Sequence, residues 1–128
     1  MLVVISDLHL GDGTTADSIS PGAFRLFAKR LNETARFASW RRDGRYRPIE
    51  SLDVLLMGDI LDPLHSTHWL DTIPSDTNYI RPWSDPSNSN YAPKLLEVTR
   101  AILEENKEAI HILRRCANGE EIHLEPAD

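Results

Sequence analysis

The stretch LVVISDLHLGDG, residues 2–13, decides the fold that we expect for this chain. It opens on a short, almost continuous apolar run, which is typical of a strand buried on both faces of a parallel sheet. Two polar side chains, Asp7 and His9, follow at once, with glycines at positions 11 and 13. A strand over residues 2–6 therefore carries a carboxylate and an imidazole to its carboxyl end.

A helix is predicted over about residues 21–40, after a polar loop. Ser20 and Pro21 fit an N-cap and the first helical position. Apolar side chains then recur at helical spacing, at Phe24, Phe27, Leu31, Ala35 and Ala38.

A second apolar run, residues 52–57, repeats the opening design and stops at GDILD, residues 58–62. Strand, helix and strand over this length predict a βαβ unit, whose two strands run parallel. Both polar clusters then lie at the carboxyl ends of parallel strands, which is the edge where open α/β sheets bind ligands.

Residues 63–92 contain four prolines and predict a long loop, and loops of this length are usually functional or disordered. Three aromatic side chains, Trp69, Tyr79 and Trp83, argue against full disorder, so a lid or rim is expected. Helical periodicity returns over about residues 91–117 and ends at an Asn-Gly cap. Two strands are too narrow to cover the apolar stripes of two helices, so we expect the amino-terminal part of a longer protein.

The net charge is −6, from 20 acidic and 14 basic residues, which argues against broad binding to nucleic acid or anionic lipid. A phosphorylated substrate is still compatible with this charge, because bound metal ions invert the local sign. No apolar run approaches the roughly 18 residues of a membrane span, and no basic leader is present, so a cytoplasmic protein is expected. The one cysteine, Cys116, excludes an internal disulfide and lies in the helical pattern, which predicts a buried thiol.

The polar residues after the two strands are candidate metal ligands. Asp7 and His9 are two apart, so both point to the same side while the chain stays extended. Asp59 and Asp62 follow the second strand, where Gly58 allows a sharp turn. Carboxylates and imidazole suit zinc, manganese or iron. A lone D-x-H pattern is common and Gly-Asp is frequent in turns, so the residues alone leave metal binding and ordinary turns both open.

The motifs SDLHLG and LLMGDILD resemble those of the calcineurin-like metallophosphoesterases, which begin with D-x-H and G-D-x-x-D. The resemblance covers about residues 1–62. It implies two divalent ions (Mn²⁺, Fe²⁺ or Zn²⁺), with Asp7 and His9 binding one and Asp59 bridging both. It implies that Asp62 orients the catalytic histidine of a later motif.

The same resemblance implies an α/β fold: the N-terminal portion of an αββα sandwich, in which a parallel βαβ unit is followed by a long loop and a helix. Residues 1–128 would form a single, incomplete domain of that type. The family's later motifs, G-N-H-D or G-N-H-E, a separate histidine and G-H-x-H, do not occur here. The full-length protein would hydrolyse phosphomonoesters, phosphodiesters or pyrophosphates, and the 128-residue segment alone would be inactive.

Two alternatives stay open at this point. The chain could be a non-catalytic metal-binding or protein-interaction module, in which three ligands hold one ion and the aromatic loop binds a partner. His65 and His68 follow the second motif and could face a substrate, although the sequence favours an ordinary loop role for both. Neither the substrate nor the oligomeric state follows from the sequence.

Overall fold

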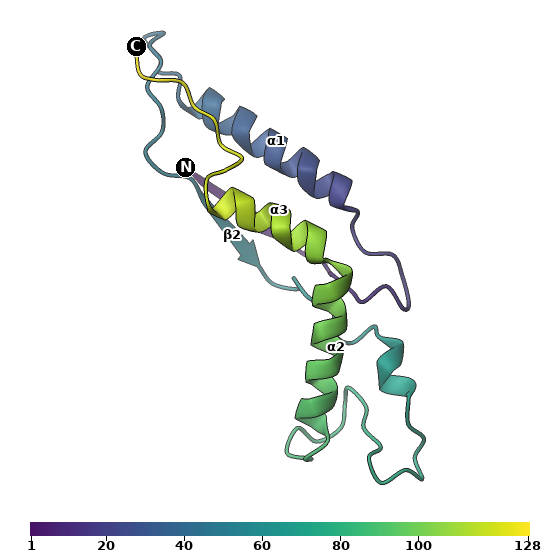
Figure 1. The fold of residues 1–128 in the computed structure, drawn as a ribbon. Helices are drawn as coiled ribbons and strands as arrows, with labels where there is room; N and C mark the ends of the chain where they lie inside the picture. Colours follow the sequence, from purple (N-terminus) through teal and green to yellow (C-terminus); the bar gives the residue numbers. More distant parts are fainter. The chain divides into compact units, whose positions relative to one another are not determined.

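The computed structural model describes residues 1–128, which form a small mixed α/β structure with one parallel sheet and three α-helices (Figure 1). The elements follow in the order β1 (Leu2–Ser6), α1 (Pro21–Ala38), β2 (Asp53–Met57), the 3₁₀ helix η1 (Thr67–Leu70), α2 (Tyr91–Glu105) and α3 (Lys107–Ala117). The chain divides into two compact units. The sheet unit comprises Met1–Asp7, Ser20–Gly58 and Glu108–Asp128, and the loop unit comprises Leu8–Ile19 and Asp59–Lys107.

The sheet unit contains the predicted βαβ connection. β1 and β2 are parallel, with Leu2 opposite Asp53 and Ser6 opposite Met57. Between them α1 starts after Ser20 with a proline in its first turn, and its buried face is Phe24, Ala28, Leu31 and Ala35. The predicted strands, helix and parallel pairing are confirmed.

The prediction that both faces of the strands are buried is wrong, because one face of the sheet is exposed within residues 1–128. Successive strand side chains point to opposite faces, and one face holds Val54 and Leu56, which line a cavity with Phe27 of α1 and Leu113 of α3. On β1 Leu2 and Val4 are more than half exposed, and on β2 Leu55 and Met57 are about half exposed. The helices of the sheet unit therefore lie over one face of the sheet, where Leu56 is still 40% exposed, and leave the other apolar face open.

The single helix predicted over about residues 91–117 is also wrong, because the structure breaks it into α2 and α3 at Asn106. Asn106 is buried, and its side-chain nitrogen donates to the carbonyl oxygens of Gly11 (2.7 Å) and Ile102 (2.8 Å). The apolar periodicity of the sequence continues through residue 106, so the sequence did not predict the break. None of the helices is long and apolar enough to cross a membrane.

The loop over residues 63–92 packs around its own apolar centre. Trp69 and Ile80 are almost fully buried, and the Trp69 indole nitrogen donates to the carbonyl oxygen of Pro63 at 2.6 Å. The Arg81 guanidinium donates to the carbonyl oxygens of Trp69 and Thr72 and so ties the loop to itself. The aromatic residues argued against full disorder, and Trp69 is at the centre of this packing. A role as a lid or rim stays a prediction.

Cys116 is only partly buried, on α3 beside the cavity that Phe27 and Leu113 line. Burial raises the pKa of its thiol, and the nearby Glu121 carboxylate adds to the effect. The thiol is thus kept protonated near neutral pH. The burial that was predicted for it is only partial.

Candidate metal centre

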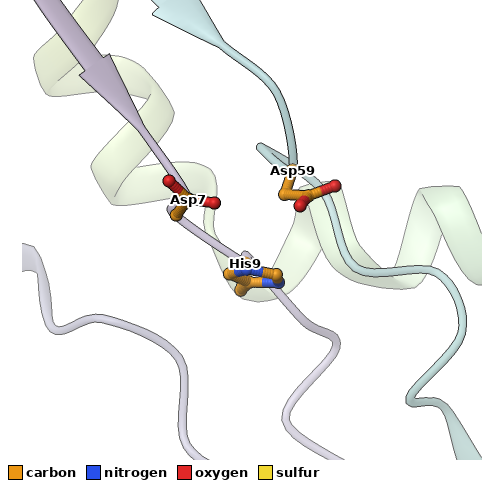
Figure 2. A group of neighbouring side chains, drawn as sticks. All are labelled: Asp7, His9 and Asp59. Carbon is orange, nitrogen blue, oxygen red and sulfur yellow. The ribbon is translucent and has the colours of Figure 1, made fainter.

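Asp7, His9 and Asp59 come together directly after β1 and β2 (Figure 2). Each offers one potential ligand atom, and these atoms lie within 4.8 Å of one another. All three residues are exposed. The two predicted clusters of polar residues therefore supply three neighbouring side chains, two carboxylates and one imidazole.

The backbone reaches this arrangement by turning, whereas the sequence prediction assumed an extended chain. Asp7, His9 and Asp59 have φ angles of 56°, 45° and 36°, and they are the non-glycine residues of the chain with positive φ. A left-handed conformation costs a non-glycine residue roughly 1–2 kcal/mol. Strained residues of this kind cluster at functional sites, where the surrounding structure holds them in place.

Hydrogen bonds between the two segments that leave the sheet hold these turns. The backbone nitrogen of His9 donates to the carbonyl oxygen of Asp59 at 2.8 Å. The backbone nitrogen of Leu10 donates to the carbonyl oxygen of Ile60, and that of Asp62 donates to the carbonyl oxygen of Leu10, both at 2.9 Å. Leu10 is 2% exposed and pairs in parallel with the backbone of Leu61. A buried leucine and a short parallel bridge therefore fix His9 and Asp59 against each other.

Asp62 lies outside the group of three potential ligands and contacts two histidines. Its carboxylate oxygens lie 2.7 and 3.0 Å from Nδ1 of His65, and one of them lies 3.9 Å from Nδ1 of His9. Burial raises the pKa of the Asp62 carboxyl, but hydrogen bonds from His65 and the charges of both imidazoles outweigh it, so the pKa is lowered. An ionised Asp62 therefore orients His65, a histidine of this chain. The role implied by the resemblance, toward a histidine of a later motif, stays a prediction.

An open cavity of about 420 Å³ lies beside these residues, within the usual size range of small-molecule sites. Its wall is the loop after His9, which is held by two side chains. Thr15 Oγ1 donates to the His65 carbonyl oxygen at 2.8 Å, and Ser18 Oγ donates to the Gly11 carbonyl oxygen at 3.0 Å. The lining residues are His9, Gly11, Thr15, Ala16, Asp17, Ser18, Asp62 and His65.

The sequence analysis missed Asp12, whose side chain is completely buried. Its carboxylate accepts hydrogen bonds from the backbone nitrogen (3.0 Å) and the hydroxyl (2.6 Å) of Thr14, and also from the Ser66 hydroxyl. Burial raises the pKa of Asp12, but these hydrogen bonds outweigh it and lower the pKa overall. The carboxylate anchors the cavity wall to the segment that carries His65. The only sequence signal was Asp-Gly-Thr, a pattern typical of a side-chain-capped turn.

A second group, His68, Asp71 and Glu97, also brings three potential ligand atoms within 4.8 Å. Here the Lys94 ammonium already lies 3.3 Å from the Asp71 carboxylate and 2.8 Å from that of Glu97. Burial lowers the pKa of Lys94, but the two carboxylates outweigh it and raise the pKa. A metal ion at this group would have to displace the Lys94 ammonium from both carboxylates. We therefore interpret the group as an ion-pair network that joins η1 to α2, and His68 as part of it.

No protein-family model, curated protein or solved structure matches this chain. The candidate metal centre thus rests on its own geometry. The resemblance to the calcineurin-like metallophosphoesterases stays a prediction from the two motifs.

Proposed function

We propose that Asp7, His9 and Asp59 form part of the dinuclear metal centre of a phosphate ester hydrolase of the calcineurin-like type. The convergence of these three side chains, each on a backbone turn of positive φ, is the observation that carries the proposal. Two carboxylates placed beside each other repel, and a cation between them removes that repulsion. Turns alone would not require ionisable side chains to converge.

The donor set fits the metals that the motifs imply. One imidazole and two carboxylates suit Mn²⁺, Fe²⁺ or Zn²⁺. Asp7, His9 and Asp59 would hold the ions, and Asp62, whose carboxylate lies 3.9 Å from Nδ1 of His9, would not bind metal. Ions held there would supply charge to stabilise the phosphate oxygens and would lower the pKa of the attacking water. The exposure of all three residues leaves room for the remaining ligands and the substrate.

The sheet supports the finer fold proposal, the N-terminal portion of an αββα sandwich. In such a sandwich each sheet has helices on one face and packs its other face on a second sheet. Helices α1 and α3 line a cavity on one side of β1 and β2, and Leu2, Val4, Leu55 and Met57 make the opposite face apolar and exposed. A second sheet would cover these four side chains.

The substrate class is a phosphomonoester, a phosphodiester or a pyrophosphate. The 128 residues do not contain the family's later motifs, which would supply the other ligands of the second ion and the histidine that protonates the leaving group. We therefore assign hydrolysis to the full-length protein and expect the segment alone to bind metal without turnover. A cytoplasmic location remains the prediction from sequence.

Calorimetric titration of the chain with Mn²⁺ and Zn²⁺ tests the assignment. We expect Asp59→Asn to lower the metal affinity at least tenfold, because it removes a charged ligand but keeps the size of the side chain. Asp53→Asn, which changes an exposed carboxylate at the start of β2, should leave the affinity unchanged. Equal affinities for the wild type and Asp59→Asn would refute the proposed centre.

The alternative, a non-catalytic metal-binding or interaction module, is separated by a second titration. If the metal-loaded chain binds inorganic phosphate, the open coordination positions serve an anion, as a hydrolase requires. If metal binds and phosphate does not, the module is the better description.

A further inference from the structure

His65 is oriented by a neighbouring carboxylate rather than buried in a core. Its Nδ1 lies 2.7 Å from Asp62 Oδ2, its backbone nitrogen lies 3.4 Å from Asp62 Oδ1, and its side chain is 75% exposed. Because Nδ1 faces the carboxylate, Nε2 is the ring nitrogen left for another partner. An exposed imidazole held in one orientation is preorganised for binding.

The same carboxylate oxygen connects His65 to the candidate metal centre. Asp62 Oδ2 is the atom that lies 3.9 Å from Nδ1 of His9, so both imidazoles approach one oxygen atom. Both histidines also line the 420 Å³ cavity. A group bound to an ion at His9 and extending into this cavity therefore comes within reach of the His65 ring.

The backbone around His65 is anchored on both sides. Thr15 Oγ1 donates to the carbonyl oxygen of His65, and the next residue, Ser66, is buried and hydrogen-bonded to the buried Asp12. These contacts fix the backbone that carries the imidazole. A histidine that only faces solvent in a loop would not need such anchoring.

The chemistry of the cavity indicates which ligand it takes. The His65 ring is a hydrogen-bonding group suited to phosphate oxygens, whereas Asp17 and Asp62 repel a free anion. The hydroxyls of Thr15 and Ser18 already donate to the carbonyl oxygens of His65 and Gly11 and shape the cavity wall. A phosphate group would thus bind only when metal ions reverse the charge of the site.

We propose that His65 is a substrate-binding residue, whose Nε2 donates a hydrogen bond to a phosphoryl oxygen of the ester beside the metal centre. The proposal rests on the proposed hydrolase function. Asp62 then has a defined task, since its carboxylate holds the imidazole at Nδ1 while Nε2, on the far side of the ring, contacts the phosphate. An imidazole that donates from both nitrogens carries both ring protons.

The test uses inorganic phosphate as the probe and the Mn²⁺-loaded chain as the receptor. Phosphate that binds beside paramagnetic Mn²⁺ broadens in its phosphorus NMR spectrum, and calorimetry measures the Mn²⁺ affinity separately. We expect His65→Ala to weaken phosphate binding about tenfold, the usual effect of losing a hydrogen bond to a charged group, and to leave Mn²⁺ affinity within twofold of wild type. His65→Gln should restore part of the phosphate binding, because its amide nitrogen lies near the position of Nε2. His111→Ala removes an exposed histidine of α3 and serves as the matched control.

Each outcome bears on one of the two proposals. Equal phosphate affinity in wild type and His65→Ala, with Mn²⁺ still required, would overturn the role of His65 and leave the hydrolase proposal standing. A parallel loss of Mn²⁺ binding in His65→Ala would overturn it too, because His65 would then support the metal centre itself. Failure of the wild type to bind Mn²⁺ would refute the proposed function first.

Discussion

The left-handed backbone at Asp59 leads to a prediction about stability that is independent of metal. Asp59 has a φ of 36°, where alanine is strained by roughly 1–2 kcal/mol and glycine is not. Glycine loses more chain entropy on folding, by about 0.4–1 kcal/mol. The strain is the larger effect, so Asp59→Gly should be more stable than Asp59→Ala by about 1 kcal/mol. The hydrogen bond from the His9 nitrogen to the Asp59 carbonyl oxygen is retained in both variants.

Urea unfolding with a chelator present measures this difference, and Lys29 provides the control. Lys29 is exposed in the interior of α1, where alanine should be more stable than glycine by about 1 kcal/mol. The order of the two variants should thus reverse between the sites. Mn²⁺ at 100 times the Kd of the wild type should then stabilise the wild type by about 2.7 kcal/mol and Asp59→Gly, with an affinity at least tenfold lower, by no more than about 1.4 kcal/mol. Asp59→Ala as stable as Asp59→Gly would show that the turn is not left-handed.

Three further predictions follow from the same contacts. The pKa of Asp12 is lowered in the folded state, so its carboxylate stabilises the fold at pH values above the ordinary carboxyl pKa of about 3.9. This stabilisation is lost as the pH falls through the folded-state pKa. Asp12→Asn should therefore flatten the acid limb of a profile of unfolding free energy against pH. Asn106→Ala should destabilise the chain by about 1–3 kcal/mol in urea, because the two hydrogen bonds that the buried Asn106 amide donates to Gly11 and Ile102 are lost, whereas the exposed Asn118→Ala should change little. The chain should show no Mn²⁺-dependent turnover of an aryl phosphate. Turnover that Asp7→Ala abolishes would show that the 128 residues are sufficient for hydrolysis without the family's later motifs.

The predictable part of the fold is the part that local patterns determine. The apolar runs and the N-cap before Pro21 located β1, β2 and α1, and the length of the connection made the strands parallel. The break at Asn106 was not predictable, because it depends on a hydrogen bond to Gly11, which is far away in sequence. Burial of Leu2 and Val4 was predicted wrongly for a similar reason, since a strand pattern does not say how many layers surround it.

Asp7, His9 and Asp59 are compatible with two interpretations, as ordinary turn residues and as metal ligands. Aspartate and histidine are among the residues that best tolerate left-handed backbone, so a turn at Asp7, His9 and Asp59 is compatible with their types even without metal. The structure makes them turn residues and neighbours at once, so the turn reading and the ligand reading are both compatible with it. Only a substitution that changes one property separates them. Asparagine keeps the tolerance for positive φ and removes the charge, and glycine removes the strain along with the side chain. If Asp59→Asn folds like the wild type but has lost Mn²⁺ affinity, the carboxylate is there for the ion and the turn is the means of presenting it.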